Sequence, residues 1–263
     1  MKSPGTAPCL FCPSSATRKA GEHIWDDWLN RFEGKPVKDK YLYTRLNRQG
    51  NVVQAVTRSR IDSARPVVCD ECNNEWMSDL TNEFKATAET IIRHGRSCSL
   101  LPLGIATLST YAFMKAVILD PDNRKPYFSS AVCHHFRQTL EMPTGVQIWL
   151  ASFRGPKRFE VNVDTGSSMI TSGRFAGYEF YVFTYLVGHL VIQLTFPRWT
   201  RFARRRPPLP AWIPARHWWT AHLDLYPGVS QLTWPPKLYL DRDGLKQFRD
   251  RLGRGEVHLV QPA

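Results

Sequence analysis

Two cysteine pairs constrain the fold of this chain more than any other feature. Cys9 and Cys12 form one C-x-x-C pair, and Cys69 and Cys72 form a second one. Together they supply four thiols, enough to complete the tetrahedral coordination of a structural zinc ion. The 56 residues between the pairs exceed the spacing of about 15–20 residues found in simple two-pair zinc modules. The long insertion still permits the site, because the entropy of loop closure grows only slowly with loop length.

The rest of the sequence favours metal ligation by these thiols over disulfide formation. No apolar stretch follows Met1–Gly5, and polar residues interrupt the most apolar late segment, 181–196. We therefore expect neither a secretory signal nor a membrane span, and a cytoplasmic location. The cytoplasm keeps thiols reduced, which leaves them available to a metal ion. We expect the two remaining cysteines, Cys98 and Cys133, to be buried thiols.

The charge balance points to a polyanionic partner. The chain has 263 residues and a net charge of +12, with 43% hydrophobic residues, a globular composition. Residues 1–97 carry 15 Lys and Arg against 12 Asp and Glu, whereas residues 98–263 carry 20 against 11, and 15 of those 20 are Arg. Arginine forks onto phosphate oxygens, so nucleic acid is the expected partner and a membrane is not.

A dense arginine run is the candidate nucleic-acid contact. Its members are Arg201, Arg204, Arg205 and Arg206, and Trp199 and Trp212 flank them. Arginines there could neutralise phosphates while the indole rings stack on exposed bases. The alternative is a solvated basic loop with its tryptophans buried underneath.

The periodicity of apolar residues predicts an α+β protein. A helix should follow Cys72, because apolar residues recur at helical spacing from Trp76 to Ile91, and Gly95 should end it. Further helices are expected at 24–32, 105–119, 128–141 and 245–252, a hairpin at 41–46 and 52–57, and strands at 146–151, 160–163, 177–185 and 189–196. We expect a zinc-stapled domain at 1–97 and a domain of helices and antiparallel sheet at 98–263.

Polar residues beside the cysteine pairs suggest hydrolytic chemistry. Glu22 and His23 follow Cys12 by ten residues, and Asn73 directly follows Cys72. A site closed by four cysteines has no open position to activate water, so catalysis would require a second, harder cation such as Mg²⁺ or Mn²⁺. Glu22 and Asn73 offer it oxygen ligands, and a neutral His23 could accept a proton from water.

The order Cys9-x2-Cys12, Glu22-His23, Cys69-x2-Cys72-Asn73 resembles the zinc-containing branch of the HNH endonucleases, over residues 8–95. Within that branch, the string Glu22-His23-Ile24-Trp25-x-x-Trp28-Leu29 is similar to uncharacterised bacterial, often actinobacterial, HNH-like proteins. The resemblance implies a treble-clef ββα-metal fold. It further implies four cysteines on a structural zinc ion, His23 as general base, and Glu22 and Asn73 as ligands of a catalytic cation.

The chain departs from that family at two places. The middle asparagine of the H-N-H pattern has no clear counterpart, although Asn47 and Asn51 lie in the expected hairpin. Asp26 stands where relatives often have proline.

Two functions follow from these patterns. One is a metal-dependent endonuclease that hydrolyses phosphodiester bonds, foremost in DNA, in a host-defence setting, with residues 98–263 holding the substrate or sensing a trigger. The other is a zinc-stapled nucleic-acid-binding module with a degenerate HNH site and no catalysis.

Overall fold

The computed structural model describes residues 8–14, 22–23, 26, 28–29, 41–46, 52–58, 64–120, 126–156, 159–165, 178–199, 222–226 and 230–250. The chain divides into two compact units. The first holds residues 1–83 and 114–141, and the second holds residues 84–113 and 142–263. Both units combine helices with antiparallel strands, which confirms the expected α+β class.

The first unit contains short strand pairs and the helices that follow the second cysteine pair. Its elements are β1 (Glu22–His23), β2 (Tyr41–Leu46), β3 (Val52–Arg58), β4 (Ala64–Arg65), α1 (Asp70–Asn74), the first part of α2 (Trp76–His94), the last part of α3 (Pro102–Ile118), and α4 (Ser130–Thr139). Strand β1 pairs with β4, and β2 pairs with β3, both antiparallel. The β2–β3 pair is the hairpin predicted between the two cysteine pairs.

Helix α2 forms where the apolar periodicity predicted it. Leu80, Phe84, Ala88 and Ile91 recur on one side and are all buried. The helix ends at Gly95, whose φ of 62° lies in the left-handed region that glycine adopts without strain. The Gly95 N–H donates to the Ile91 carbonyl at 2.8 Å, which satisfies one carbonyl of the last turn.

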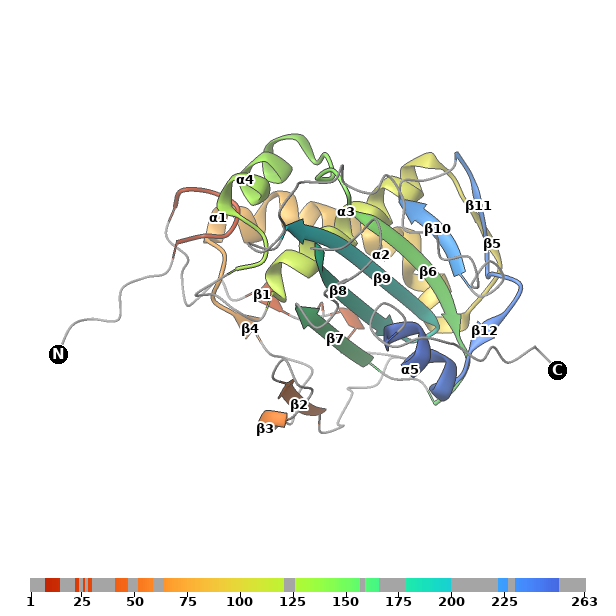
Figure 1. Ribbon diagram of the computed structural model, residues 1–263. Coiled ribbons are helices and arrows are strands. Elements are labelled where there is room, and N and C mark those ends of the chain that lie inside the picture. The colour runs from red at the N-terminus through yellow and green to blue at the C-terminus, as the bar shows by residue number, and fades with distance from the viewer. Residues whose placement is uncertain are drawn as a thin grey trace. The chain divides into compact units, whose positions relative to one another are not determined.

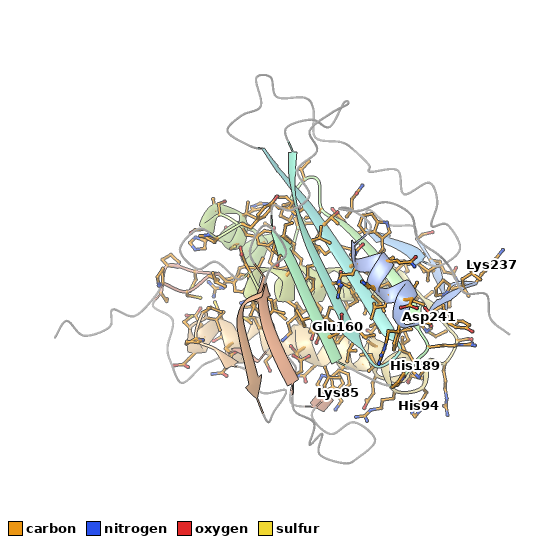
Figure 2. The ribbon with its side chains drawn as sticks, turned by 60° about the horizontal axis from the view of Figure 1, so that its bottom comes forward. Lys85, His94, Glu160, His189, Lys237 and Asp241 are labelled. Carbon is orange, nitrogen blue, oxygen red and sulfur yellow. The ribbon has the colours of Figure 1, made fainter. Side chains whose placement is uncertain are left out.

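Gly95 also gives the histidine of a neighbouring turn room to pack. A Cβ atom at Gly95 would lie 3.1 Å from Cγ of His189. The His189 N–H donates to the Ile92 carbonyl at 3.1 Å, and its ring Nδ1 lies 3.0 Å from the Phe153 carbonyl oxygen. Figure 2 shows His189 beside the end of α2 that carries His94. This histidine therefore fastens the β8–β9 turn to the end of α2.

The second unit is built on a six-stranded sheet. Its elements besides the helical segments 84–94 and 102–113 are β5 (Cys98–Leu100), β6 (Gln147–Phe153), β7 (Phe159–Thr165), β8 (Tyr178–Val187), β9 (Leu190–Trp199), β10 (His222–Tyr226), β11 (Leu232–Trp234), β12 (Tyr239–Leu240) and α5 (Arg242–Asp250). The strand order is β10-β6-β9-β8-β7, all antiparallel, and β12 joins β6 in parallel. Strands β5 and β11 form a separate pair.

Both faces of this sheet carry packed side chains, because alternate residues of a strand point to opposite faces. On one face Trp149, Leu186 and Val191 form a core cluster with Leu245 and Phe248 of α5. On the other face the Tyr185 ring lies 6.4 Å from the Tyr111 ring of α3, which stacks on Phe84 of α2 at 3.6 Å. Figure 1 shows α5 in front of the sheet, and behind it the parts of α2 and α3 that belong to this unit.

The structure confirms some of the elements predicted from the sequence and leaves others untested. The longer helices and strands lie where the sequence predicts them, whereas the strand pairs β1–β4 and β5–β11 were not expected. The helix predicted at 24–32 and the arginine run at 201–206 lie largely or wholly outside the described residues. The assignment of residues 1–97 and 98–263 to separate functional domains stays a prediction. No helix in the described ranges has the length and apolar character needed to cross a membrane.

Candidate metal centre

The first cysteine pair lies in a tight loop tied to the segment before the second pair. The Cys9 N–H donates to the Ser14 carbonyl at 2.7 Å and closes the loop. The Phe11 N–H points at the Cys9 sulfur at 3.4 Å. The Leu10 N–H donates to the Val67 carbonyl at 2.9 Å, two residues before Cys69. The bond from Leu10 to Val67 therefore links the two pairs across the 56-residue insertion.

The second pair opens a helix. Cys69 is the N-cap of α1, with φ of −86° and ψ of 165°, and its sulfur accepts the Cys72 N–H at 3.5 Å. The Asn73 N–H donates to the Cys69 carbonyl at 3.0 Å and completes the turn. A thiolate at an N-cap satisfies one of the free N–H groups of the first turn, so the sulfur is well placed to carry negative charge.

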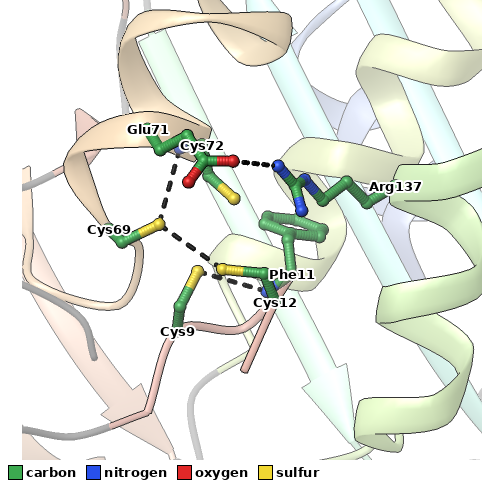
Figure 3. A network of polar contacts seen from close by, with 7 residues as sticks. All are labelled: Cys9, Phe11, Cys12, Cys69, Glu71, Cys72 and Arg137. Atoms are coloured by element: carbon green, nitrogen blue, oxygen red, sulfur yellow. Dashed lines mark hydrogen bonds and ion pairs between the residues drawn. The ribbon is translucent and has the colours of Figure 1, made fainter. Parts of the chain in front are cut away.

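The four sulfur atoms gather at one point. They all lie within 4.8 Å of one another, and Sγ of Cys12 and Sγ of Cys69 are 3.5 Å apart. A tetrahedral site with Zn–S bonds of about 2.3 Å requires sulfur separations of about 3.8 Å. All four cysteines are buried, with exposed fractions of 5% or less. Figure 3 shows the sulfurs pointing toward one another, an arrangement that suits a structural zinc-like ion.

Burial and local hydrogen bonds act differently on the individual thiols. Burial raises the pKa of Cys9 and that of Cys72. Burial also acts to raise the pKa of Cys12, but hydrogen bonds from Ser14 and from the neighbouring thiols outweigh it and lower that pKa to about 7. Four thiolates buried so close together would repel one another, and a bound divalent ion would supply the positive charge that offsets them.

Two cysteines, Cys98 and Cys133, lie outside this cluster. All six cysteines fall within the described residues, and none forms a disulfide. Cys133 on α4 is buried as expected, and its burial, with the charge of Asp120, raises its pKa to about 12. Cys98 on β5 is only half-buried, and its partial burial raises its pKa.

Helix α4 contributes residues that sequence reasoning missed. The Phe11 ring packs edge-on against Trp76 at 5.0 Å, and the Phe136 ring of α4 lies 6.5 Å from Phe11 and 6.1 Å from Trp76. Arg137 Nη2 donates to Oε1 of Glu71, between the second pair of cysteines, at 2.6 Å. No sequence motif marks α4 as a neighbour of the cysteines. The sequence hints only at an apolar neighbour, because Leu10 and Phe11 lie inside the first cysteine pair.

The predicted catalytic residues are placed in part. In the β1–β4 pair, Glu22 lies opposite Arg65 and His23 lies opposite Ala64. Strand β4 precedes Cys69 by only a few residues in the sequence. Asn73 lies in α1 beside Cys72 and is half-buried. The side chains of Glu22 and His23 lie outside what the structure describes, so the catalytic roles stay predictions.

The other candidate residues of the sequence are not placed. The arginines 201, 204, 205 and 206 and the candidate middle asparagines, Asn47 and Asn51, lie outside the described residues.

A buried ion pair lies just beyond β1. Lys115 Nζ and Asp26 Oδ1 are 2.8 Å apart, and their side chains are 0% and 6% exposed. Asp26 therefore ties the segment after His23 to helix α3. The sequence signal was Lys115 itself, the single charged side chain in an otherwise apolar helix.

Comparison of this chain with protein-family models, with curated proteins and with solved structures finds no match, so the comparisons identify no family for it.

Proposed function

We propose that this chain is a zinc-stapled, metal-dependent endonuclease of the HNH type that hydrolyses phosphodiester bonds in nucleic acid, foremost in DNA. The observation that carries the proposal is the antiparallel pairing of Glu22 and His23 with residues 64–65. Together with the bond from Leu10 to Val67, it brings the Glu-His motif to the segment that leads into Cys69-x2-Cys72-Asn73. These are the motifs whose order resembles the HNH family.

The order of elements supports the same proposal. A cysteine pair is followed by the β2–β3 hairpin, and the second cysteine pair opens a helix. This is the order expected of a treble-clef ββα-metal unit. Four cysteine ligands leave no open coordination position, so the zinc ion has a structural role there. A reducing cytoplasm suits such a site, because it keeps the thiols available as ligands.

The proposed chemistry rests on a second cation and three residues. Glu22 and Asn73 would supply oxygen ligands to Mg²⁺ or Mn²⁺, which would stabilise negative charge on the scissile phosphate. His23 would take the proton from the attacking water, as a neutral imidazole near pH 7 can. The net charge of +12 and the run from Arg201 to Arg206 favour binding of the phosphate backbone.

A cleavage assay tests this function. Zinc-loaded wild type should nick supercoiled DNA in the presence of Mg²⁺ or Mn²⁺. His23→Ala should lower the rate by at least ~100-fold, because general base catalysis contributes that much or more. The zinc content should not change, since His23 is not a zinc ligand in this proposal. His94→Ala, at an exposed position on α2, is the matched control and should cut like wild type.

The alternative function gives a different result. A nucleic-acid-binding module without catalysis would cut neither DNA nor RNA with any of these cations. It would bind nucleic acid in a salt-sensitive manner, and His23→Ala would leave that binding intact.

A further inference from the structure

Helix α4 brings an apolar cover to the four-cysteine centre from a distant part of the chain. Phe136 is fully buried and contacts both Phe11, inside the first cysteine pair, and Trp76, at the start of α2. Ser129 caps α4 by accepting the Val132 N–H at 3.3 Å, so the helix is well defined where it begins. An apolar cover excludes water and strengthens every charge interaction beneath it.

The next residue of α4 is a cation that reaches the second cysteine pair. Arg137 Nη2 lies 2.6 Å from Oε1 of Glu71, and Figure 3 shows this contact beside the sulfurs. The Arg137 and Glu71 side chains are 28% and 55% exposed. An ion pair so exposed contributes little stability by itself, typically about 0–1 kcal/mol. A role for Arg137 must therefore come from its surroundings.

Those surroundings would be strongly negative with the metal ion bound. Four thiolates around one divalent cation would leave two net negative charges in this buried centre, and Glu71 would add a third at its edge. Uncompensated buried charge is costly, and a nearby cation offsets that cost. Burial lowers the pKa of Arg137, but the hydrogen bond to Glu71 and the charges of Cys72, Glu71 and Cys12 outweigh it and raise that pKa. The contact that carries this cation to the centre is the one with Glu71, which lies directly before Cys72, and Figure 3 shows the guanidinium on the side of the centre where Cys72 lies.

We infer that Arg137 is a positioning residue of the metal centre: its guanidinium, aimed by Glu71, offsets the negative charge of the metal-bound thiolates and slows loss of the ion. The inference rests on the four-cysteine zinc site of the proposed function and is independent of the nuclease chemistry. Helix α4 is then part of the metal centre, although it lies outside the cysteine motifs in the sequence.

Zinc release from the full-length protein tests this role. The zinc-loaded protein is mixed with an excess of a chromogenic chelator, and the release rate is followed by absorbance. Arg137→Gln should release zinc ~10–100-fold faster than wild type, the usual effect of removing a residue that supports metal ligands. Arg137→Lys keeps the charge and should stay within a few-fold of wild type. Arg93→Gln, which removes a half-buried arginine paired with Glu89 at 2.8 Å, is the matched control and should not change the rate.

Glu71→Gln separates charge compensation from a simple tether. It removes the ion pair but also one negative charge near the thiolates, so its release rate should rise much less than that of Arg137→Gln. Equal acceleration in Glu71→Gln and Arg137→Gln would overturn the inference and leave only a tether between α4 and the cysteine pair. Unchanged release in Arg137→Gln, or release from Arg137→Lys as fast as from Arg137→Gln, would also overturn it.

The wild-type protein separates this inference from the proposed function. If the wild-type protein binds no zinc, there is no metal centre and the inference about Arg137 fails. If the wild-type protein binds zinc but cuts no nucleic acid, only the proposed nuclease activity fails.

Discussion

Two buried threonines in the sheet of the second unit differ in one hydrogen bond. Thr184 on β8 accepts the Gln193 side-chain N–H at 3.1 Å. Thr195 on β9 is fully buried, and its hydroxyl has no hydrogen-bond partner in the described part of the chain. Burying an unpaired hydroxyl costs about 1–3 kcal/mol by mutational data, whereas a satisfied one contributes to stability.

Replacing each threonine by valine should therefore shift stability in opposite directions. Thr195→Val removes an unpaired hydroxyl at nearly constant shape and should raise the free energy of unfolding by about 1 kcal/mol. Thr184→Val removes the acceptor of Gln193 and should lower it by about 1 kcal/mol. Urea unfolding followed by circular dichroism measures both. A loss of stability in Thr195→Val would mean that its hydroxyl has a partner.

At the residue scale the cysteine ligands were predictable and their supports were not. Two C-x-x-C pairs whose thiols stay reduced are typical of a shared metal site. The cysteines of these pairs could therefore be predicted as one cluster of Cys9, Cys12, Cys69 and Cys72. Arg137 could not, because an arginine on a helix has many possible partners and only the fold selects Glu71.

At the scale of elements, helix α3 carries a cation in its buried part. Lys115 is fully buried and pairs with Asp26 at 2.8 Å, which fixes the segment just after strand β1. Forming such a pair gives little net stability, because both ions lose their hydration. Breaking it is costly, because one charge stays buried without the other.

Lys115→Met should lower the free energy of unfolding by about 3–5 kcal/mol, because the Asp26 carboxylate stays buried without its lysine. The double variant Asp26→Leu, Lys115→Met should recover most of that loss, since it replaces the ion pair by apolar contacts. Chemical unfolding of the single and double variants provides the measurement. If the double variant is as unstable as Lys115→Met, the stability lost in Lys115→Met does not come from an unpaired Asp26 carboxylate.

Helices and strands were predictable where they are long enough for the spacing of apolar residues to repeat. Shorter elements were not. Helix α2 shows five apolar residues at helical spacing, and strands β8 and β9 are each ten residues long. Strands β1, β4 and β12 have two residues each, too few to show an alternation. Their pairing comes from the fold around them. Strand β10, His222–Tyr226, alternates in polarity and could have been found despite its Pro- and Trp-rich flanks.

At the scale of the whole molecule, we expect the two units to depend differently on a bound metal ion. The first has short strand pairs and gathers four of its five cysteines at one point. The second has a continuous core, which includes Trp149, Leu186 and Phe248, and does not contain the cysteine cluster. The return of residues 114–141 to the first unit was not predictable, because no local pattern links α4 to a cysteine pair far back in the chain.

Removing the metal ion should unfold part of the molecule. A strong chelator, or Cys69→Ser, should remove part of the helical circular dichroism signal, because metal binding and folding of such a site are coupled. The second unit should retain a separate cooperative transition on heating. Cys98→Ser, outside the cluster, is the matched control and should keep both the metal and the signal. Metal-free protein with an unchanged spectrum would contradict the prediction.

The most direct test of the account is binding of a second cation beside the structural one. Zinc-loaded protein is titrated with Mn²⁺, and the free Mn²⁺ is quantified by electron paramagnetic resonance. Wild type should bind a single Mn²⁺ ion, and Glu22→Gln and Asn73→Ala should each weaken that binding while the zinc content stays unchanged. A wild type that binds no Mn²⁺, or a Glu22→Gln variant that binds it like wild type, would contradict the account.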